Sequence, residues 1–289
     1  MDAATAISAL RPGQDVRGEF ACTRKDRRKT RTGSPYLALS LRDRTGEIPA
    51  RAFQNADALA GRFERGDVVA VRGRVQRFRD ELVLELSDIR RAPHPDPARF
   101  LPAAYRDVDE LEGFLEHLAG EVYDPGYRGL LGALLGDAQL RAEWRRAPCS
   151  RNGHHAYLGG LLEHTVAVAT LAHDTCQLHP RLNSDLLICA AVVHDLGRTR
   201  EFTYGAEIGL TDEGRLLGHL VIGERILTAA GARHLDAERE LALLHCVLCH
   251  HGPSAAPGGA FASPEALALH RLNALDAGVK GALEHGLGA

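Results

Sequence analysis

Separated segments of the chain place histidine and aspartate within otherwise apolar, helix-like sequence. Ionisable side chains are rarely buried without partners, so a set of them on apolar faces indicates a shared site. Any one core histidine is more often satisfied by a hydrogen bond, but several imidazoles together with carboxylates are the typical ligands of divalent transition metals. The pattern therefore predicts a metal site. Its candidate residues are His164, His194, Asp195, His219, His250, His251 and Asp276.

Helices are expected to position these side chains. A helix over residues 160–177 places His164 on its apolar face. The next helix begins near residue 184, is apolar on all sides and ends at His194 and Asp195, with Gly197 as a C′ residue. Two ionisable groups at the end of a buried helix need partners, so both can face one ion or one can orient the other.

Three further helices complete the predicted site. One begins near residue 211 and carries His219, and another begins near residue 236 and ends at His250 and His251. The last opens with an N-cap serine followed by proline and places Asp276 on a face with Leu272, Leu275 and Val279. A carboxylate on such a face is costly unless it is paired or coordinated.

Composition is typical of a globular protein of about two domains, with 289 residues, 45% hydrophobic and 25% charged. The longest apolar run, Leu186 to Val193, is too short to span a bilayer, and the N-terminus lacks a basic, then apolar, signal pattern. We therefore expect a cytoplasmic protein with no membrane segment. Its six scattered cysteines favour reduced thiols, and Cys246 and Cys249 form a lone CxxC that is more simply explained as two buried helix residues than as half of a zinc ribbon.

Charge is distributed unevenly along the chain. Residues 11–91 contain 19 Lys and Arg against 12 Asp and Glu, a net charge of +7, and the remainder carries a net charge of −10. A basic N-terminal segment thus precedes an acidic C-terminal one. The first is suited to a polyanion and the second to cations.

Hydrophobic periodicity divides the chain at the same place. Residues 15–91 alternate with the period of two that is typical of strands, whereas helical spacing follows residue 108 or so. Five strands, with a short helix between the third and fourth, are the order of an OB-fold, a barrel that commonly binds single-stranded nucleic acid or oligosaccharide. The sequence thus predicts a multidomain α and β protein with a five-stranded OB-fold β-barrel and an all-α helical bundle. The expected strands are 15–24, 36–42, 47–53, 67–78 and 81–89, the short helix is 55–63, and the domains are 1–91, a Pro-rich linker at 92–107, and 108–289.

The barrel carries the candidate nucleic-acid-binding residues. Basic residues between the first two strands, where an OB-fold has a binding loop, would neutralise phosphates, and exposed aromatic rings would stack on bases. The alternatives are that the basic run is a solvated loop and that the aromatic rings, Phe20 among them, fill the barrel. The candidates are Arg24, Lys25, Arg28, Lys29, Tyr36, Phe53, Arg74 and Phe78.

The histidine-bearing segments resemble known enzymes. His164, His194-Asp195 and the later Asp276 resemble the H…HD…D signature of HD-domain metal-dependent phosphohydrolases. The segments 154–164, 193–197, 211–219 and 249–252 resemble the YhaM family of bacterial 3′-to-5′ exoribonucleases, which also has an OB-fold before its HD domain. The likeness covers residues 13–92 and about 105–285. It implies metal ligands at His164, His194, Asp195, His219, His250 and Asp276, with His251 as a further ligand or a phosphate contact.

These residue types suit particular ions and a particular reaction. Histidine with carboxylate favours Mn²⁺, the expected metal, or Fe²⁺, Co²⁺, Ni²⁺ or Zn²⁺ over Mg²⁺, which prefers oxygen ligands. Six ligands exceed the need of one tetrahedral ion, so we expect two divalent ions about 3.5–4 Å apart, bridged by Asp195, that activate water for in-line attack on phosphorus. The expected catalytic residues are Asp195, Arg198 and His251, and the expected substrate-phosphate contacts are Arg151, His154, His155 and Arg215.

Arg198 departs from the family pattern, which usually has lysine after Asp-x-Gly. Arginine keeps the positive charge and can grip a phosphate with two hydrogen bonds, but it does not readily give up a proton. If the family's lysine acts through its charge alone, activity persists. If the lysine donates a proton, the rate or the substrate changes.

Three functions fit these features. The first is a metal-dependent 3′-to-5′ exonuclease acting on single-stranded RNA or DNA. The second is a phosphohydrolase of a small nucleotide whose barrel is a regulatory module, since a fold alone does not choose the substrate. The third is a non-catalytic single-strand-binding protein. The full ligand set disfavours the third and the basic barrel disfavours the second, so we expect the nuclease. The sequence allows a homo-oligomer but does not indicate one.

Overall fold

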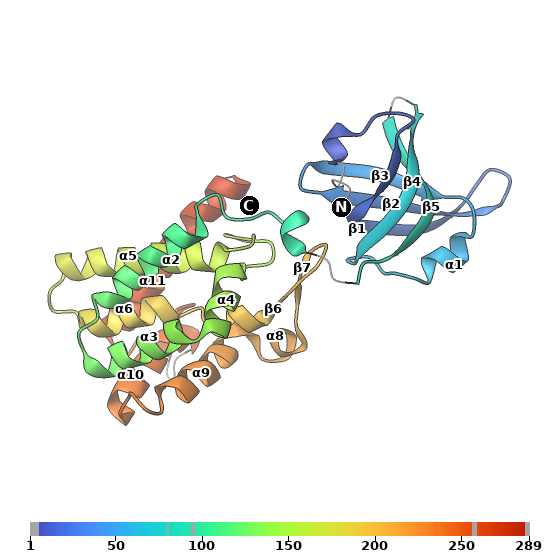
Figure 1. Ribbon diagram of the computed structural model, residues 1–289. Coiled ribbons are helices and arrows are strands. Elements are labelled where there is room, and N and C mark those ends of the chain that lie inside the picture. Colours follow the sequence, from blue (N-terminus) through green and yellow to red (C-terminus); the bar gives the residue numbers. More distant parts are fainter. Residues whose placement is uncertain (1–5, 80, 94–95, 256–258, 287–289) are drawn as a thin grey trace. The chain divides into compact units, whose positions relative to one another are not determined.

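In the computed structural model the described residues are 6–79, 81–93, 96–255 and 259–286. The chain forms two compact units, residues 1–102 with 203–209, and residues 103–202 with 210–289 (Figure 1). Asp80, between the last two predicted strands, and His94 and Pro95 of the predicted linker lie outside the described residues. Within the described ranges, none of the helices is long and apolar enough to cross a membrane.

The first unit is a closed five-stranded barrel in the order β1-β2-β3-β5-β4, as expected for an OB-fold. Every neighbouring pair is antiparallel except β3 and β5, which run parallel. Alternate residues of β2, such as Leu37, Leu39 and Leu41, are buried inside the barrel. The elements are β1 (Asp15–Lys29), β2 (Pro35–Asp43), β3 (Gly46–Ala52), α1 (Ala56–Ala60), β4 (Val68–Phe78) and β5 (Glu81–Arg91).

The sequence predicts a loop for the basic segment after residue 24, but in the structure this segment is a strand. It continues β1 and pairs with β2 from Arg24 opposite Ser40 to Lys29 opposite Pro35. The connection is a short turn, in which Gly33 has a φ of +85°. Ladder hydrogen bonds to β2 thus override the weak strand propensity of lysine and arginine. As a result, the basic side chains are held on a strand.

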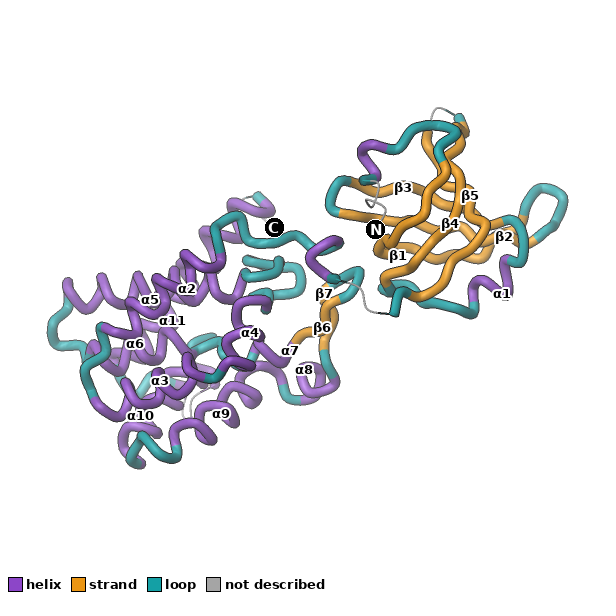
Figure 2. Tube along the Cα trace, in the orientation of Figure 1, coloured by secondary structure: helices purple, strands orange, loops and turns teal. Residues whose placement is uncertain are grey.

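The second unit is a helical bundle, shown as purple tubes in Figure 2. Helices α5 and α6 lie at its centre: both contact α2 and α11, and α6 also contacts α3 and α10. All eight residues from Leu186 to Val193 are buried, as the apolar run predicted. The helices are α2 (Val108–Gly120), α3 (Pro125–Gly136), α4 (Ala138–Arg146), α5 (Gly160–Leu178), α6 (Ser184–Val193), α7 (Arg198–Glu201), α8 (Asp212–Leu216), α9 (Gly218–Gly231), α10 (Ala237–Cys249) and α11 (Pro264–His285).

Two local features differ from the sequence prediction. The helix expected from residue 211 is broken into α8 and α9, because Gly218 adopts a φ of +71° that does not continue a helix. A short two-stranded sheet, β6 (Phe202–Tyr204) with β7 (Ile208–Leu210), precedes this break and was not foreseen. Its three-residue strands are too short for a recognisable alternation.

One buried carboxylate joins α2 to α4, and its loss should destabilise the protein. Glu112 accepts hydrogen bonds from Arg141 and Arg145. Burial opposes ionisation of Glu112, but the two arginines outweigh it and lower its pKa. Glu112→Gln should lower the free energy of unfolding at pH 7 by about 1–2 kcal/mol, since both arginines are partly exposed and screened.

The pH dependence follows from the sign of that shift. A carboxyl with a lowered folded-state pKa stabilises the protein above its unfolded pKa, about 4.3, and the contribution is lost as the pH falls through the folded value. Urea unfolding of wild type and Glu112→Gln should therefore differ at pH 7 and converge in acid. Glu110→Gln is the matched control on the same helix, since the side chain of Glu110 is exposed and pairs with the exposed Arg106. An equal loss for both variants would contradict this role.

Candidate metal centre and nucleic-acid-binding surface

Four helices deliver the histidines of the predicted metal site to one place in the bundle. His164 lies on the buried face of α5, and His194 directly follows α6. His219 is in the first turn of α9, and His250 directly follows α10. His164, His194 and His250 are almost fully buried. The sequence pattern predicts His164, His194 and His250 on or at the end of the helices where the structure has them. His219 lies in the first turn of α9 because the predicted helix is broken at Gly218.

Asp195 lies at the centre of the cluster, with its two carboxylate oxygens facing different histidines. Oδ2 is 3.8 Å from Nε2 of His164 and 3.7 Å from Nε2 of His194. Oδ1 is 3.4 Å from Nε2 of both His219 and His250. The carboxylate thus stands between two pairs of imidazoles, which is the arrangement needed to bridge two cations.

Hydrogen bonds on the far edge of the imidazoles fix which nitrogen faces Asp195. Nδ1 of His194 donates to the carbonyl of Ala191 at 2.8 Å, and Nδ1 of His250 donates to the carbonyl of Val247 at 2.6 Å. A neutral imidazole that donates through Nδ1 keeps a lone pair at Nε2, and in both rings Nε2 is the nitrogen that faces the carboxylate. Outer hydrogen bonds of this kind orient histidines for metal binding.

Unsatisfied polar atoms in the cluster fit a cation. Asp195 Oδ1 and His250 Nε2 are buried and lack a hydrogen-bond partner among the described residues, although they lie 3.4 Å apart. Two acceptors held this close repel each other unless a positive charge lies between or beside them. The donor set of imidazole and carboxylate is the one that divalent transition metals prefer.

The protonation states also suit metal binding. Burial opposes ionisation of Asp195, but Arg198 and the surrounding histidines outweigh it and hold its pKa well below the usual range. Burial lowers the pKa of His194 well below its ordinary value. His251 has its pKa lowered to about 3, first by burial and then by His250. At neutral pH the carboxylate is charged and these two imidazoles are neutral, as ligands must be.

His251 stands beside His219 at the edge of the cluster. Their Nε2 atoms are 2.9 Å apart, and His251 is the more exposed of the two. Asp195, His219, His250 and His251 each offer a donor atom, and these four atoms lie within 4.8 Å of one another. The geometry is compatible with both roles expected for His251, as a metal ligand and as a phosphate contact.

Arg198 is buried rather than directed to solvent. Its Nε lies 2.7 Å from Asp195 Oδ2, and its guanidinium reaches Glu201 at 3.3 Å. The angle of the first contact is too poor for a hydrogen bond, so we treat it as an ion pair of two close charges. Arg198 therefore acts on the carboxylate directly.

The four expected phosphate contacts differ in their surroundings. His155 is 2% exposed, and its ring nitrogens contact Asp276 at 3.0 Å and Tyr157 at 2.8 Å. This corrects the expectation for His155, because a ring with both nitrogens occupied in the interior does not reach a substrate phosphate. His154 is closer to the cluster, with its ring 5.1 Å from that of His164, and its pKa is lowered to about 4, chiefly by burial. The other two expected contacts, Arg151 and Arg215, are exposed, and Arg215 pairs with Asp212 at 3.2 Å.

Asp276 lies beside His155 and His164, and donor atoms of these three residues are within 4.8 Å of one another. Its Oδ2 accepts a hydrogen bond of 2.6 Å from Nδ1 of His164, on the ring edge opposite His194. Of the apolar residues predicted to share its helix face, Leu272 packs against the core, whereas Leu275 and Val279 are about half exposed. Asn273, three residues before Asp276, is buried.

Three residues near the cluster were missed from sequence. Asn273 Oδ1 lies 3.0 Å from His164 Nε2, and Glu201 contacts the ring of His219 at 3.4 Å. The thiol of Cys149 is 3.6 Å from Asp195 Oδ2, and burial raises its pKa well above the ordinary value. Asn273 was detectable, because it follows Ala266 and Leu269 at helical spacing on the buried face. Cys149 lies between helices, where no periodic pattern marks it.

The barrel carries a separate group of exposed aromatic rings. Tyr36 and Phe53 stack with centroids 5.3 Å apart, and Phe53 is 45% exposed. Phe78 is 46% exposed, with the guanidinium of Arg51 4.5 Å from its ring centre. Large exposed rings beside cations are the features of a single-strand-binding surface. Arg51 was missed from sequence because it is an isolated arginine on a strand.

The basic candidates on the barrel are mostly exposed, with one exception. Lys25 is only 14% exposed, and its Nζ lies 2.9 Å from Glu64 and 4.8 Å from the ring centre of Phe63. Lys25 therefore links β1 to the segment after α1, and its ammonium group is not directed to a nucleic-acid ligand. The remaining basic candidates lie on the surface: Arg24, Arg28, Lys29 and Arg74. Both Arg24 and Arg28 pair with Asp26.

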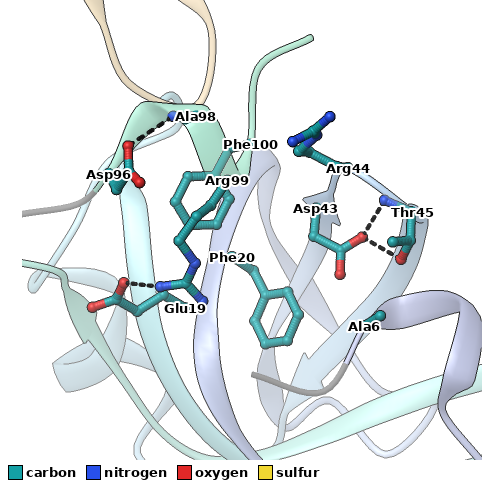
Figure 3. Close-up of a pocket in the computed structure, with 10 residues that line it drawn as sticks. All are labelled: Ala6, Glu19, Phe20, Asp43, Arg44, Thr45, Asp96, Ala98, Arg99 and Phe100. Atoms are coloured by element: carbon teal, nitrogen blue, oxygen red, sulfur yellow. Dashed lines mark hydrogen bonds and ion pairs between the residues drawn. The ribbon is translucent and has the colours of Figure 1, made fainter. Parts of the chain in front are cut away.

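Phe20 does not belong to the aromatic surface. It is 3% exposed and packs in the barrel core, so it is the filling residue that the alternative interpretation proposed. It lines a pocket of about 380 Å³ together with Phe100, shown in Figure 3. Two arginines, Arg44 and Arg99, line the pocket, but Arg99 is paired with Glu19 at 2.9 Å, and with Asp43 and Asp96 the lining acids outnumber the arginines. This pocket is therefore poorly suited to a phosphate backbone.

Comparisons with known proteins agree with both halves of this description. Residues 161–278 match the HD domain model, and residues 22–92 match a model of the OB-fold nucleic acid binding domain. The second OB-fold domain of replication protein A from Methanococcus maripaludis matches 32% of this chain and 97% of its own, with 20% identity and a TM-score of 0.26.

Two full-length relatives extend the match across both units. The 3′-5′ exoribonuclease YhaM of Shouchella clausii is 29% identical over 288 residues, which cover 95% of this chain and 87% of that protein. YhaM of Bacillus subtilis is 30% identical over 252 residues, which cover 85% of this chain and 79% of that protein. With its closed barrel, its bundle and its histidine cluster, the chain belongs to the YhaM family of 3′-5′ exoribonucleases.

Proposed function

We propose that this protein is a metal-dependent 3′-to-5′ exonuclease that hydrolyses single-stranded RNA. The observation that carries the proposal is Asp195, whose two oxygens each face a different pair of histidine Nε2 atoms. A pair of cations bridged by a carboxylate is a recurring device for phosphodiester hydrolysis. Direction and sugar preference come from the relatives, which are named 3′-5′ exoribonucleases.

Two groups of residues would hold the ions. His164, His194 and Oδ2 of Asp195 form one group, and His219, His250 and Oδ1 of Asp195 form the other, with His251 beside it. When bound, divalent ions lower the pKa of water and stabilise charge on the transferring phosphoryl group. The nitrogen-rich set favours Mn²⁺, Fe²⁺, Co²⁺, Ni²⁺ or Zn²⁺ over Mg²⁺, and we propose Mn²⁺.

The surrounding residues of the chain tune this centre. Arg198 keeps Asp195 ionised and, paired with both Asp195 and Glu201, has its own pKa raised. These two ion pairs support a role for Arg198 as a fixed positive charge beside Asp195 rather than as a proton donor. Arginine in place of the family's usual lysine is therefore compatible with activity. His251 and His154 border the cluster, and both are neutral at neutral pH, so they are suited to donating or accepting a hydrogen bond at a substrate phosphate oxygen.

The barrel would bind the single strand. Stacking on Tyr36, Phe53 and Phe78 is tolerant of sequence because every base has a π face, which suits an enzyme that removes one nucleotide after another. The exposed arginines and lysines would neutralise the phosphates, and affinity should fall steeply with salt.

Product analysis tests the reaction class. The protein with Mn²⁺ is incubated with a single-stranded RNA oligomer, and the products are identified by mass spectrometry. We expect nucleoside 5′-monophosphates to accumulate while the oligomer shortens, without release of inorganic phosphate. Inorganic phosphate or hydrolysis confined to free nucleotides would favour a small-nucleotide phosphohydrolase and contradict the proposal.

A further inference from the structure

Helix α11 presents two polar side chains to opposite edges of one imidazole. Asn273 and Asp276 are three residues apart, so they lie on one face of the helix. Asn273 Oδ1 is 3.0 Å from Nε2 of His164, and Asp276 Oδ2 is 2.6 Å from Nδ1 of the same ring. We propose that Asn273 supplies the oxygen ligand from α11 and that Asp276 is a positioning residue for His164. This inference rests on the metal site proposed above.

Two further polar atoms converge on the Nε2 edge of His164. In the neutral tautomers in which Nδ1 of His164 donates to Asp276 and Nδ1 of His194 donates to Ala191, both rings carry a lone pair and no hydrogen at Nε2. These two atoms are 3.2 Å apart, and the amide oxygen of Asn273 is a third acceptor beside them. Three acceptors in a buried space call for a cation, and Asp195 supplies the counter-charge.

The Nδ1 edge is already satisfied by hydrogen bonds. Asp276 Oδ2 accepts a short hydrogen bond from His164 Nδ1 at 2.6 Å and one of ordinary length from His155 Nε2 at 3.0 Å. The two nitrogens of an imidazole point away from each other, so a group on one edge does not share an ion with donors on the other. A cation among His155, His164 and Asp276 would have to displace both of these protons.

The same division of roles occurs at the other histidines. The carbonyls of Ala191 and Val247 hold Nδ1 of His194 and His250, and Glu201 lies 3.4 Å from Nδ1 of His219. In each ring an oxygen acceptor holds Nδ1 and Nε2 faces Asp195. Asp276 completes this pattern for His164, which is why we assign it to orientation.

A neutral amide at this position has a chemical consequence. Asn273 leaves Asp195 as the one carboxylate in the proposed ligand set, with His164, His194, His219 and His250 supplying nitrogen. The bound ions would keep more of their positive charge than they would with a second carboxylate. The centre should therefore bind metal less tightly and attract an anionic phosphodiester more strongly than a carboxylate-rich one.

Cobalt binding to the full-length protein tests this assignment without reference to activity. Co²⁺ is titrated into wild type, Asn273→Asp, Asn273→Leu, Asp276→Asn and Asp276→Ala, and its visible absorption gives both affinity and ligand geometry. Asn273→Leu should weaken binding about 10- to 100-fold, as loss of a ligand or its support does, and Asp276→Ala should do likewise. Asn273→Asp should tighten binding by about tenfold and change the spectrum, because a charge is added at the ion.

The conservative change at Asp276 separates the two roles. Asp276→Asn keeps an oxygen that can accept from His164 Nδ1, so it should restore binding to within about threefold of wild type and leave the spectrum unchanged. Circular dichroism of each variant identifies any that fails to fold. Loss of binding in folded Asp276→Asn, or an unchanged spectrum and affinity in Asn273→Asp, would overturn the assignment. Wild-type protein that bound no Co²⁺ would overturn the proposed metal site itself, and this inference with it.

Discussion

Asp195→Asn is expected to lower the rate of single-stranded RNA hydrolysis by about 10³-fold or more, since metal ions supply several kcal/mol of charge stabilisation and each 1.36 kcal/mol is tenfold. The carboxylate faces both histidine pairs, with its oxygens 3.4–3.8 Å from their Nε2 atoms. An amide of the same shape removes the negative charge between the histidine pairs and the nearer of the two carboxylates that pair with Arg198. Initial rates at saturating Mn²⁺ measure the effect.

The same variant should still bind RNA, because its barrel is unchanged. A gel-shift titration with an oligomer is expected to give a dissociation constant close to that of wild type. Asp174→Asn is the matched control, since Asp174 is an exposed residue of α5 whose side chain contacts His173. It should leave both rate and affinity unaltered. Hydrolysis by Asp195→Asn at more than a tenth of the wild-type rate would show that the carboxylate does not hold the catalytic centre.

Phe53→Ala is expected to weaken binding of single-stranded RNA by about 5- to 150-fold, corresponding to about 1–3 kcal/mol for one base stacked on an aromatic ring. Phe53 is 45% exposed and supports Tyr36, so its loss removes one stacking surface and loosens another. Fluorescence anisotropy with a labelled oligomer, at fixed salt, measures the change.

Tyr105→Ala provides the control for this prediction. Tyr105 is a fully exposed aromatic residue of the helical unit, and its removal should leave affinity unaltered. Metal content should be the same in both variants as in wild type. Equal affinities for Phe53→Ala and wild type would mean that the strand does not stack on this surface of the barrel.

The barrel was predictable because its strands have one face in the core. Leu37, Leu39 and Leu41 alternate with partly exposed residues, and such alternation has a single physical explanation. The basic end of β1 was not predictable in the same way, because Arg28 and Lys29 have no buried face and are held by hydrogen bonds to β2. The local hydrophobic pattern of a sequence shows which side chains are buried. It does not show which distant strand a segment pairs with.

The candidate metal centre was predictable to the extent that its proposed ligands interrupt apolar helices. His164, His194 and Asp195 stand out in this way, and their segments were correctly placed on helix faces or ends. The choice between Asn273 and Asp276 was not, because it depends on how α11 is rotated against α5 by its packing. Residue type alone favours Asp276 as the ligand. We propose Asn273 instead because it lies at Nε2 of His164, whereas Asp276 lies at Nδ1.

Glycine at position 197 illustrates a related difference. The helical pattern predicts Gly197 at a helix end, where a left-handed conformation is usual, but its φ is −61°. A Cβ at this position would clash with the carbonyl of His219 and the backbone of Gly223. Glycine is required there because α9 passes close to the turn after Asp195, which brings His219 to the centre.

Digestion of matched 5′-labelled single-stranded RNA and DNA oligomers with Mn²⁺, with and without chelator, tests the central claim most directly. The account predicts a ladder of RNA products that shortens from the 3′ end, slower shortening of DNA, and no products of either once chelator removes the metal. Cleavage that continues in chelator, or an intact RNA oligomer in the presence of protein shown to hold Mn²⁺, would contradict it.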